Sequence, residues 1–194
     1  MNYTRYQEPI KKPSNMPNAN NTTDTVSACD VSTQTTNDQT RPEIAFISGP
    51  IDTGADSSYF HEHYAPRINA AISRGDSFVI GPVTAGVDAD ALSYLLSYPI
   101  SPDRITIFVT PAEDVACGKQ FRALGVRVEV VEGQTAGERD AAMTRSSTYD
   151  ILRWRGPDEA REFYGASWRE GYVTNTERNW QRRKGLLVDG LAPR

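Results

Sequence analysis

The sequence predicts an α/β fold in which helices cover both faces of a mostly parallel, five-stranded sheet. Two observations carry this prediction. Short apolar runs alternate with stretches whose apolar residues recur at helical spacing, from residue 44 to residue 154. Glycine turns follow the first two runs, at residues 49–54 and 81–86. Strands that alternate with helices in this way are joined by crossovers and therefore run parallel.

The first half of this pattern is the clearest. Residues 44–48 (IAFIS) are apolar enough for a strand that is buried on both faces. A helix is expected over residues 59–73, where Tyr64 and Ile68 begin an apolar stripe. The pair Arg74 and Gly75 is a typical helix end.

The later elements are expected from the same signals. Strands are predicted at residues 77–80, 104–110, 126–131 and 149–154, and helices at residues 87–98, 135–147 and 174–184. Residues 111–124 are expected to form a loop and a short helix around Phe121. Two T-x-x-E capping boxes, which begin at Thr135 and Thr174, mark two of the helix starts. Residues 155–173 form a mixed segment. We expect the aromatic side chains of this region to pack as a second small core rather than to cover a cleft; they are Trp154, Tyr164, Trp168 and Tyr172.

The two ends of the chain differ from the central part. Residues 1–41 are rich in Asn, Thr, Ser and Gln and almost lack large aliphatic side chains, so a disordered polar tail is expected. The folded domain is expected over residues 42–185, with residues 186–194 frayed. A chain of 194 residues is long enough for one such domain with a substantial core.

Composition excludes several classes of partner. The net charge is −4 and residues 42–173 carry about −7, which argues against nucleic-acid binding. No apolar run approaches the roughly 18 residues of a membrane span, and no hydrophobic signal core is present at the N-terminus. The two cysteines suit a reducing compartment. We expect a cytoplasmic protein that binds neither nucleic acid nor membrane, and leave homo-oligomer formation open.

The two glycine turns predict a ligand site. Glycine lets a ligand approach the backbone, and the free amides at a helix start favour anions. Turns at the ends of adjacent strands would line one crevice. Neither turn matches the Walker A or G-x-G-x-x-G pattern. The candidate ligand-binding residues at the turns are Ser48, Gly49, Pro50, Gly81, Pro82 and Gly86.

Charged side chains near the turns could carry chemistry. Asp88 could act as an acid or base or bind a ribose hydroxyl, or it could be a helix N-terminal carboxylate favoured by the dipole. Arg139 is a further candidate ligand-binding residue; it or Asp140 could face the site, or both could be solvated. His61 and His63 lie two residues apart and would point to different faces of a helix, so no metal site is expected. No other cofactor is expected either.

Several segments also carry a family resemblance. They are residues 46–49 (FISG), 75–81 (GDSFVIG), 86–88 (GVD), 139–143 (RDAAM) and 151–154 (ILRW). Together they resemble the Rossmann-like SLOG superfamily, which includes DprA-type proteins and the LOG phosphoribohydrolases. The likeness spans residues 43–154. It implies a three-layer Rossmann-like domain with a nucleotide-type ligand at Gly49, Gly81 and Gly86.

The departures from that family bear on activity. Pro82 stands where the family has an acid, and the signature PGGxGTxxE of LOG enzymes is missing. Residues 155–158 (RGPD) replace a turn rich in glycine and threonine. The resemblance therefore does not imply LOG catalysis.

The Gly49-Pro50 turn is also similar to the start of nucleoside deoxyribosyltransferases, which use a carboxylate nucleophile on an N-glycosidic bond. Such chemistry needs a buried acid beside an oxocarbenium-like centre. Asp88 is the first candidate for this catalytic acid and Glu62 the second. Asp52 and Asp56 are the other acids nearby.

Three functions follow from these observations. The first is a nucleotide or nucleotide-sugar binding domain that acts as a sensor or ligand carrier. The second is an N-glycosidic-bond enzyme, either a nucleotide phosphoribohydrolase or a nucleoside deoxyribosyltransferase-like protein. The third is an interaction protein with a vestigial crevice. The acidic central segment suits a nucleoside or monophosphate better than a triphosphate.

Overall fold

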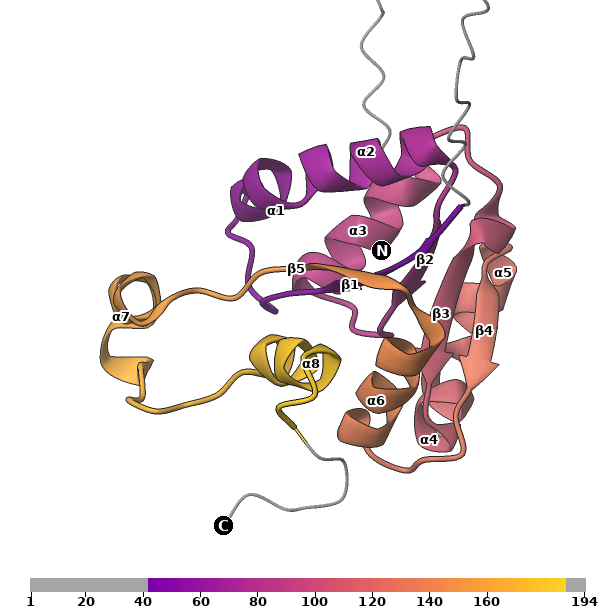
Figure 1. Ribbon diagram of the computed structural model, residues 1–194. Helices are drawn as coiled ribbons and strands as arrows, with labels where there is room; N and C mark the ends of the chain where they lie inside the picture. Colours follow the sequence, from indigo (N-terminus) through magenta and orange to yellow (C-terminus); the bar gives the residue numbers. More distant parts are fainter. Residues whose placement is uncertain (1–41, 188–194) are drawn as a thin grey trace, which may run out of the picture. The chain divides into compact units, whose positions relative to one another are not determined.

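A computed structural model describes residues 42–187. The expected tail at residues 1–41 lies outside the described residues, as do residues 188–194 of the expected frayed end. The strands are β1 (Ile44–Ser48), β2 (Ser77–Ile80), β3 (Ile105–Val109), β4 (Arg127–Val130) and β5 (Tyr149–Leu152). They form one parallel sheet in the order β4-β3-β2-β1-β5 (Figure 1), which confirms the predicted α/β fold.

Helices cover both faces of this sheet. They are α1 (Ser58–His63), α2 (Ala65–Arg74), α3 (Gly86–Leu96), α4 (Pro111–Glu113), α5 (Lys119–Ala123), α6 (Ala136–Ser146), α7 (Pro157–Tyr164) and α8 (Asn175–Arg183). Short helical turns occur at η1 (Pro102–Arg104), η2 (Asp114–Gly118) and η3 (Gly165–Ser167). The chain steps from β1 to β4 in one direction and then returns through α6 to β5. In Figure 1, α2 and α3 lie on one side of the sheet, and α6 and α8 on the other.

The two faces of the strands form two cores. Ile47, Ile80 and Ile107 point toward α2, α3 and α5 and are fully buried in the larger core. Phe46 and Val79 are paired across β1 and β2 and point to the opposite face, against Met143 of α6. Burial on both faces explains why these strands are continuous apolar runs rather than alternating ones.

The helix predicted over residues 59–73 is divided into α1 and α2 at Tyr64. Pro66 at the start of α2 explains the division, because its ring would clash with the carbonyl of residue 62 in a continuous helix. The Tyr64 hydroxyl lies 3.0 Å from the carbonyl oxygen of Ser48 and 2.8 Å from that of Arg153. The division therefore places a buried phenol between the ends of β1 and β5.

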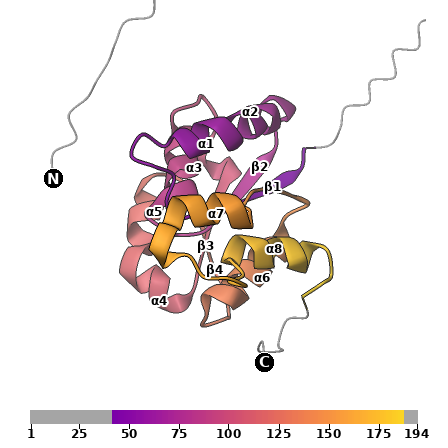
Figure 2. The same ribbon diagram turned by 90° about the vertical axis from the view of Figure 1, so that its left-hand side faces the viewer.

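The mixed segment after β5 contains α7, which the sequence did not predict, and η3. With α8 it forms a cap, residues 155–183, over the carboxyl end of β1. Figure 2 is turned to look onto this edge of the sheet and shows α7 and α8 in front of the strands. Within residues 42–187, no helix is both long and apolar enough to cross a bilayer.

Candidate functional site

A cleft of about 820 Å³ lies between the carboxyl end of β1 and the cap. The end of β1 supplies Ser48, and the turn after it supplies Gly49, Pro50 and Asp52. Lining residues from elsewhere include Asp88, Arg139, Asp140, Met143, Trp154, Arg155, Tyr164, Trp168, Tyr172, Thr176 and Asn179. The cleft is at the edge of the sheet where the sequence predicts a ligand site.

The glycines of the second turn have a different role from the one expected. Gly81, Pro82 and Gly86 do not line the cleft. Gly86 has φ +66°, and a β-carbon there would lie 2.3 Å from the carbonyl oxygens of Pro50 and Ile51. Gly86 thus lets the two turns pack directly on each other, and the space that its missing β-carbon leaves is filled by the first turn rather than by a ligand.

Gly81 makes room for Asp88. A β-carbon on Gly81 would lie 2.5 Å from the Asp88 carboxylate oxygen Oδ2. Asp88 stands in the first turn of α3 and reaches back over the end of β2 toward the cleft. The second glycine turn therefore contributes to the site indirectly, through the carboxyl group that it accommodates.

Asp88 is the most perturbed acid of the cleft. Burial raises its pKa to about 7, the negative charge of Asp140 adds to this rise, and the Arg139 guanidinium opposes it. Among residues 42–187, no side chain or amide donates a hydrogen bond to its carboxylate. The N-terminal amides of α3 favour the ionised form, but by only about 0.3–1 kcal/mol, which is too little to cancel the effect of burial on the pKa. Asp88 is therefore close to half protonated at neutral pH.

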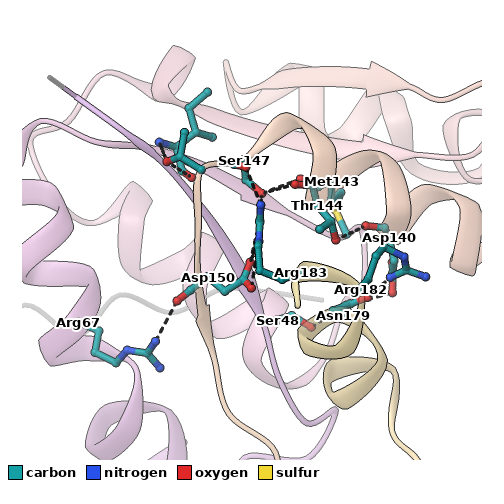
Figure 3. Close-up of polar contacts among 12 residues, drawn as sticks. Ser48, Arg67, Asp140, Met143, Thr144, Ser147, Asp150, Asn179, Arg182 and Arg183 are labelled. Carbon is teal, nitrogen blue, oxygen red and sulfur yellow. Dashed lines mark hydrogen bonds and ion pairs between the residues drawn. The ribbon is translucent and has the colours of Figure 1, made fainter. Parts of the chain in front are cut away.

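The other polar groups at this edge bond to one another. Arg139 donates to Asp140 Oδ1 at 3.0 Å and forms an ion pair with Glu113. Asn179 of α8 donates to Asp140 Oδ2 at 3.3 Å and to the Ser48 hydroxyl at 3.2 Å (Figure 3). Burial raises the pKa of Asp140, although these donors oppose the rise. This network joins β1, α6 and α8 and leaves Arg139 with its charge already paired.

Polar contacts also attach α8 to the edge strand. Figure 3 shows Arg183 between Ser147 and Asp150, to which it donates at 2.8 Å. Arg67 of α2 donates to the Asp150 carbonyl from the other side. Asn179, the residue that links α8 to Ser48, is only 2% exposed. The helix α8 thus forms a wall of the cleft.

Glu62, the second candidate for the catalytic acid, lies outside the cleft. Its side chain is 75% exposed and does not line the cleft. The reason is the orientation of α1, which turns Tyr59 and Phe60 inward and leaves Glu62 in solvent. Asp56 is also exposed and outside the cleft, whereas Asp52 lines it. Among the described residues, no three His, Cys, Asp or Glu side chains are grouped as a metal ion would need.

The expectation that the aromatic side chains after β5 pack as a second small core is wrong. Trp154, Tyr164, Trp168 and Tyr172 all line the cleft, and Tyr172 is 67% exposed. They stay outside the two cores because the chain leaves the sheet at the end of β5 and crosses the open edge. The sequence analysis missed Asn179, whose isolated position in a polar helix carries no signal. The capping box at Thr174 did predict where that helix begins.

The raised pKa of Asp88 predicts a pH-dependent effect of Asp88→Asn on stability. An unfolded aspartate ionises near pH 3.9, whereas the folded one holds its proton to about pH 7. Between these values the folded state binds the extra proton, so its stability falls as pH rises through this window. Asn carries no charge to desolvate. The variant should gain a few kcal/mol over the parent at pH 8 and little at pH 4, measured by urea unfolding. An equal difference at both pH values would contradict the assigned burial.

Comparisons with protein families, curated proteins and solved structures give no match. The resemblances to SLOG proteins and to deoxyribosyltransferases therefore stay predictions from short motifs. The geometry of the cleft is the basis for the function proposed next.

Proposed function

We propose that the cleft binds a nucleoside-type ligand and that Asp88 acts on its N-glycosidic bond. The observation that carries this proposal is the state of Asp88. It is a cleft carboxyl group with a pKa of about 7 and no hydrogen bond from a described residue. Strongly shifted acids in a cleft are typical of catalytic sites, because a pKa near the working pH suits proton transfer in both directions.

The aromatic lining supports a base as part of the ligand. A planar ring can stack on the aromatic faces of the cleft, which are those of Trp154 at the end of β5 and of Tyr164, Trp168 and Tyr172 in the cap. The cleft volume of about 820 Å³ lies in the range of small-molecule sites. A nucleotide sugar would use the same faces for its base.

Asp88 would serve as proton donor and acceptor. In its protonated form it gives its proton to the base nitrogen as the C1′–N bond breaks and that nitrogen keeps the bonding electrons. A water or acceptor hydroxyl then adds its oxygen to C1′, and the Asp88 carboxylate takes the released proton. The negative charge of Asp140 close by would stabilise the oxocarbenium-like centre between these steps.

Binding without catalysis is the second candidate, and one observation favours it. Glycosidic cleavage generally uses two carboxyl groups, but Asp140 already accepts hydrogen bonds from Arg139 and Asn179. A site in which the acid next to Asp88 is already engaged could hold a nucleotide as a sensor. In that case Asp88 would bind a ribose hydroxyl.

A combined binding and product assay separates the two. The full chain is titrated calorimetrically with nucleosides, nucleoside monophosphates and triphosphates, then incubated with each and chromatographed for free base. We expect binding of nucleosides and monophosphates in preference to triphosphates, with base released. Binding without base would leave the sensor function, and no binding of any nucleoside-type ligand would refute the proposal.

A further inference from the structure

Arg155 is a buried cation at the cleft. It follows β5 by three residues, lines the cleft and is only 7% exposed. Its Nη2 donates to the backbone carbonyl of Asp52 at 2.8 Å, and its Nη1 donates to the Tyr164 hydroxyl at 3.2 Å. These contacts hold the planar group between the first glycine turn and α7.

Aromatic rings replace water around this guanidinium. Its central carbon lies 3.7 Å from the ring centroid of Phe163, 4.3 Å from that of Tyr59 and 5.6 Å from that of Tyr164. Such contacts attract the guanidinium electrostatically and fix its plane. They do not neutralise its charge.

The charge of Arg155 has no partner among the described residues. Two other arginines near this edge are neutralised. Arg139 pairs with Glu113 and Asp140, and Arg153 bonds both carboxylate oxygens of Glu159 at 2.9 and 2.8 Å. Within residues 42–187, no carboxylate lies within ion-pair distance of Arg155. Glu159 interacts with it only at longer range, since both its oxygens are taken by Arg153.

We infer that Arg155 recognises the phosphate group of a nucleoside monophosphate, an inference that rests on the function proposed above. A buried guanidinium whose counterion is missing, at the wall of a cleft, matches the planar fork that binds phosphate. A single phosphate suits the site best. The carboxylates of Asp52, Asp88 and Asp140 line the same cleft and disfavour a longer chain of negative charges, and Arg169 adds a cation only from the exposed loop.

The test compares a nucleoside with its 5′-monophosphate on four proteins: the parent, Arg155→Gln, Arg155→Lys and Arg161→Gln. Arg161 is the matched control because it lies in α7, pairs with Asp158 and does not line the cleft; its guanidinium carbon lies 4.5 Å from the ring centroid of Trp168, so Arg161→Gln reports the loss of a cation–aromatic contact in the cap without the loss of a cleft guanidinium. Calorimetric titration should give the parent a clear preference for the monophosphate, weakened by added salt. The affinity of Arg155→Gln for the monophosphate should be about 10- to 100-fold lower than that of the parent, and its affinity for the nucleoside should be lower by about threefold or less. Arg155→Lys should fall between, because it keeps the charge and loses the fork.

The outcomes separate this inference from the proposed function. If the parent binds nucleoside and monophosphate equally, Arg155 does not recognise phosphate, whatever the variants do. If both Arg155 variants lower the affinity for the two ligands by the same factor while Arg161→Gln does not, Arg155 only holds α7 against the first turn. The inference is then overturned. If the parent binds neither ligand, the proposed function has failed instead.

Discussion

Asp88→Asn should reduce the release of free base by about 10²- to 10⁴-fold while the nucleoside still binds, because an amide cannot transfer the proton that the leaving base needs. The substitution keeps the size of the side chain, so the space beside Gly81 stays filled. The measurement is the single-turnover rate of base release at saturating nucleoside, with the free base quantified by chromatography.

The rate at which the parent releases base should depend on pH if Asp88 is the proton donor. Asp88, with a pKa of about 7, is protonated below that pH. If proton donation to the base limits the rate, base release should fall tenfold per unit as pH rises above about 7. Asp88→Asn should lack this limb.

Glu62→Gln is the matched control for this prediction. It makes the same chemical change at the other acid that the sequence suggested, and the Glu62 side chain is 75% exposed outside the cleft. Its rate should stay within about twofold of the parent, since an exposed surface carboxylate has little to contribute. A loss at Glu62 equal to that at Asp88 would refute the assignment of the cleft acid.

Gly86→Ala should lower the free energy of unfolding by about 2–5 kcal/mol, a large part of the 5–15 kcal/mol typical of a domain. Two effects add. An L-residue at φ +66° costs about 1–2 kcal/mol, and a β-carbon 2.3 Å from two carbonyl oxygens forces the turns apart, which costs about 1–3 kcal/mol more. Urea unfolding of the full chain measures the loss.

Gly185→Ala separates these effects. Gly185 has φ +70°, almost the same as Gly86, but a β-carbon there would meet no atom within 4 Å. It should therefore lose only the backbone contribution, about 1–2 kcal/mol. If the two variants lose the same free energy, the contact between the two glycine turns is not as close as described.

Local patterns predicted most of the sheet and its site edge. The apolar runs at β1 and β2 match the strands to the residue, since burial on both faces leaves a continuous signal. The capping box at Thr135 is present as predicted, with its side chain accepting from the Glu138 amide. Arg139 and Asp140 follow that cap directly, which is why they could be named as candidates.

The glycine turns show where a local pattern is ambiguous. Glycine at a strand end signals a close backbone approach but not what approaches. At Gly86 it is the other turn, and at Gly81 it is the Asp88 side chain. The sequence alone could not tell whether the neighbour of a glycine is a second turn, a side chain or a ligand, because each of these needs the space that a missing β-carbon leaves.

The sequence by itself determined the parallel α/β class, the two glycine turns and Asp88 as the first candidate acid. Buried strands, helix caps and turns each depend on a few residues that are adjacent in the sequence, so a local pattern is enough to predict them. Only the tertiary structure decided which acid lies in the cleft and which segment forms the wall of the cleft opposite β1. Glu62 fell in solvent through the orientation of one short helix, while Arg155 and Asn179 reached the cleft from a segment more than 100 residues after β1. Such placements depend on how distant elements pack, and burial, which sets the pKa of Asp88, is a property of that packing.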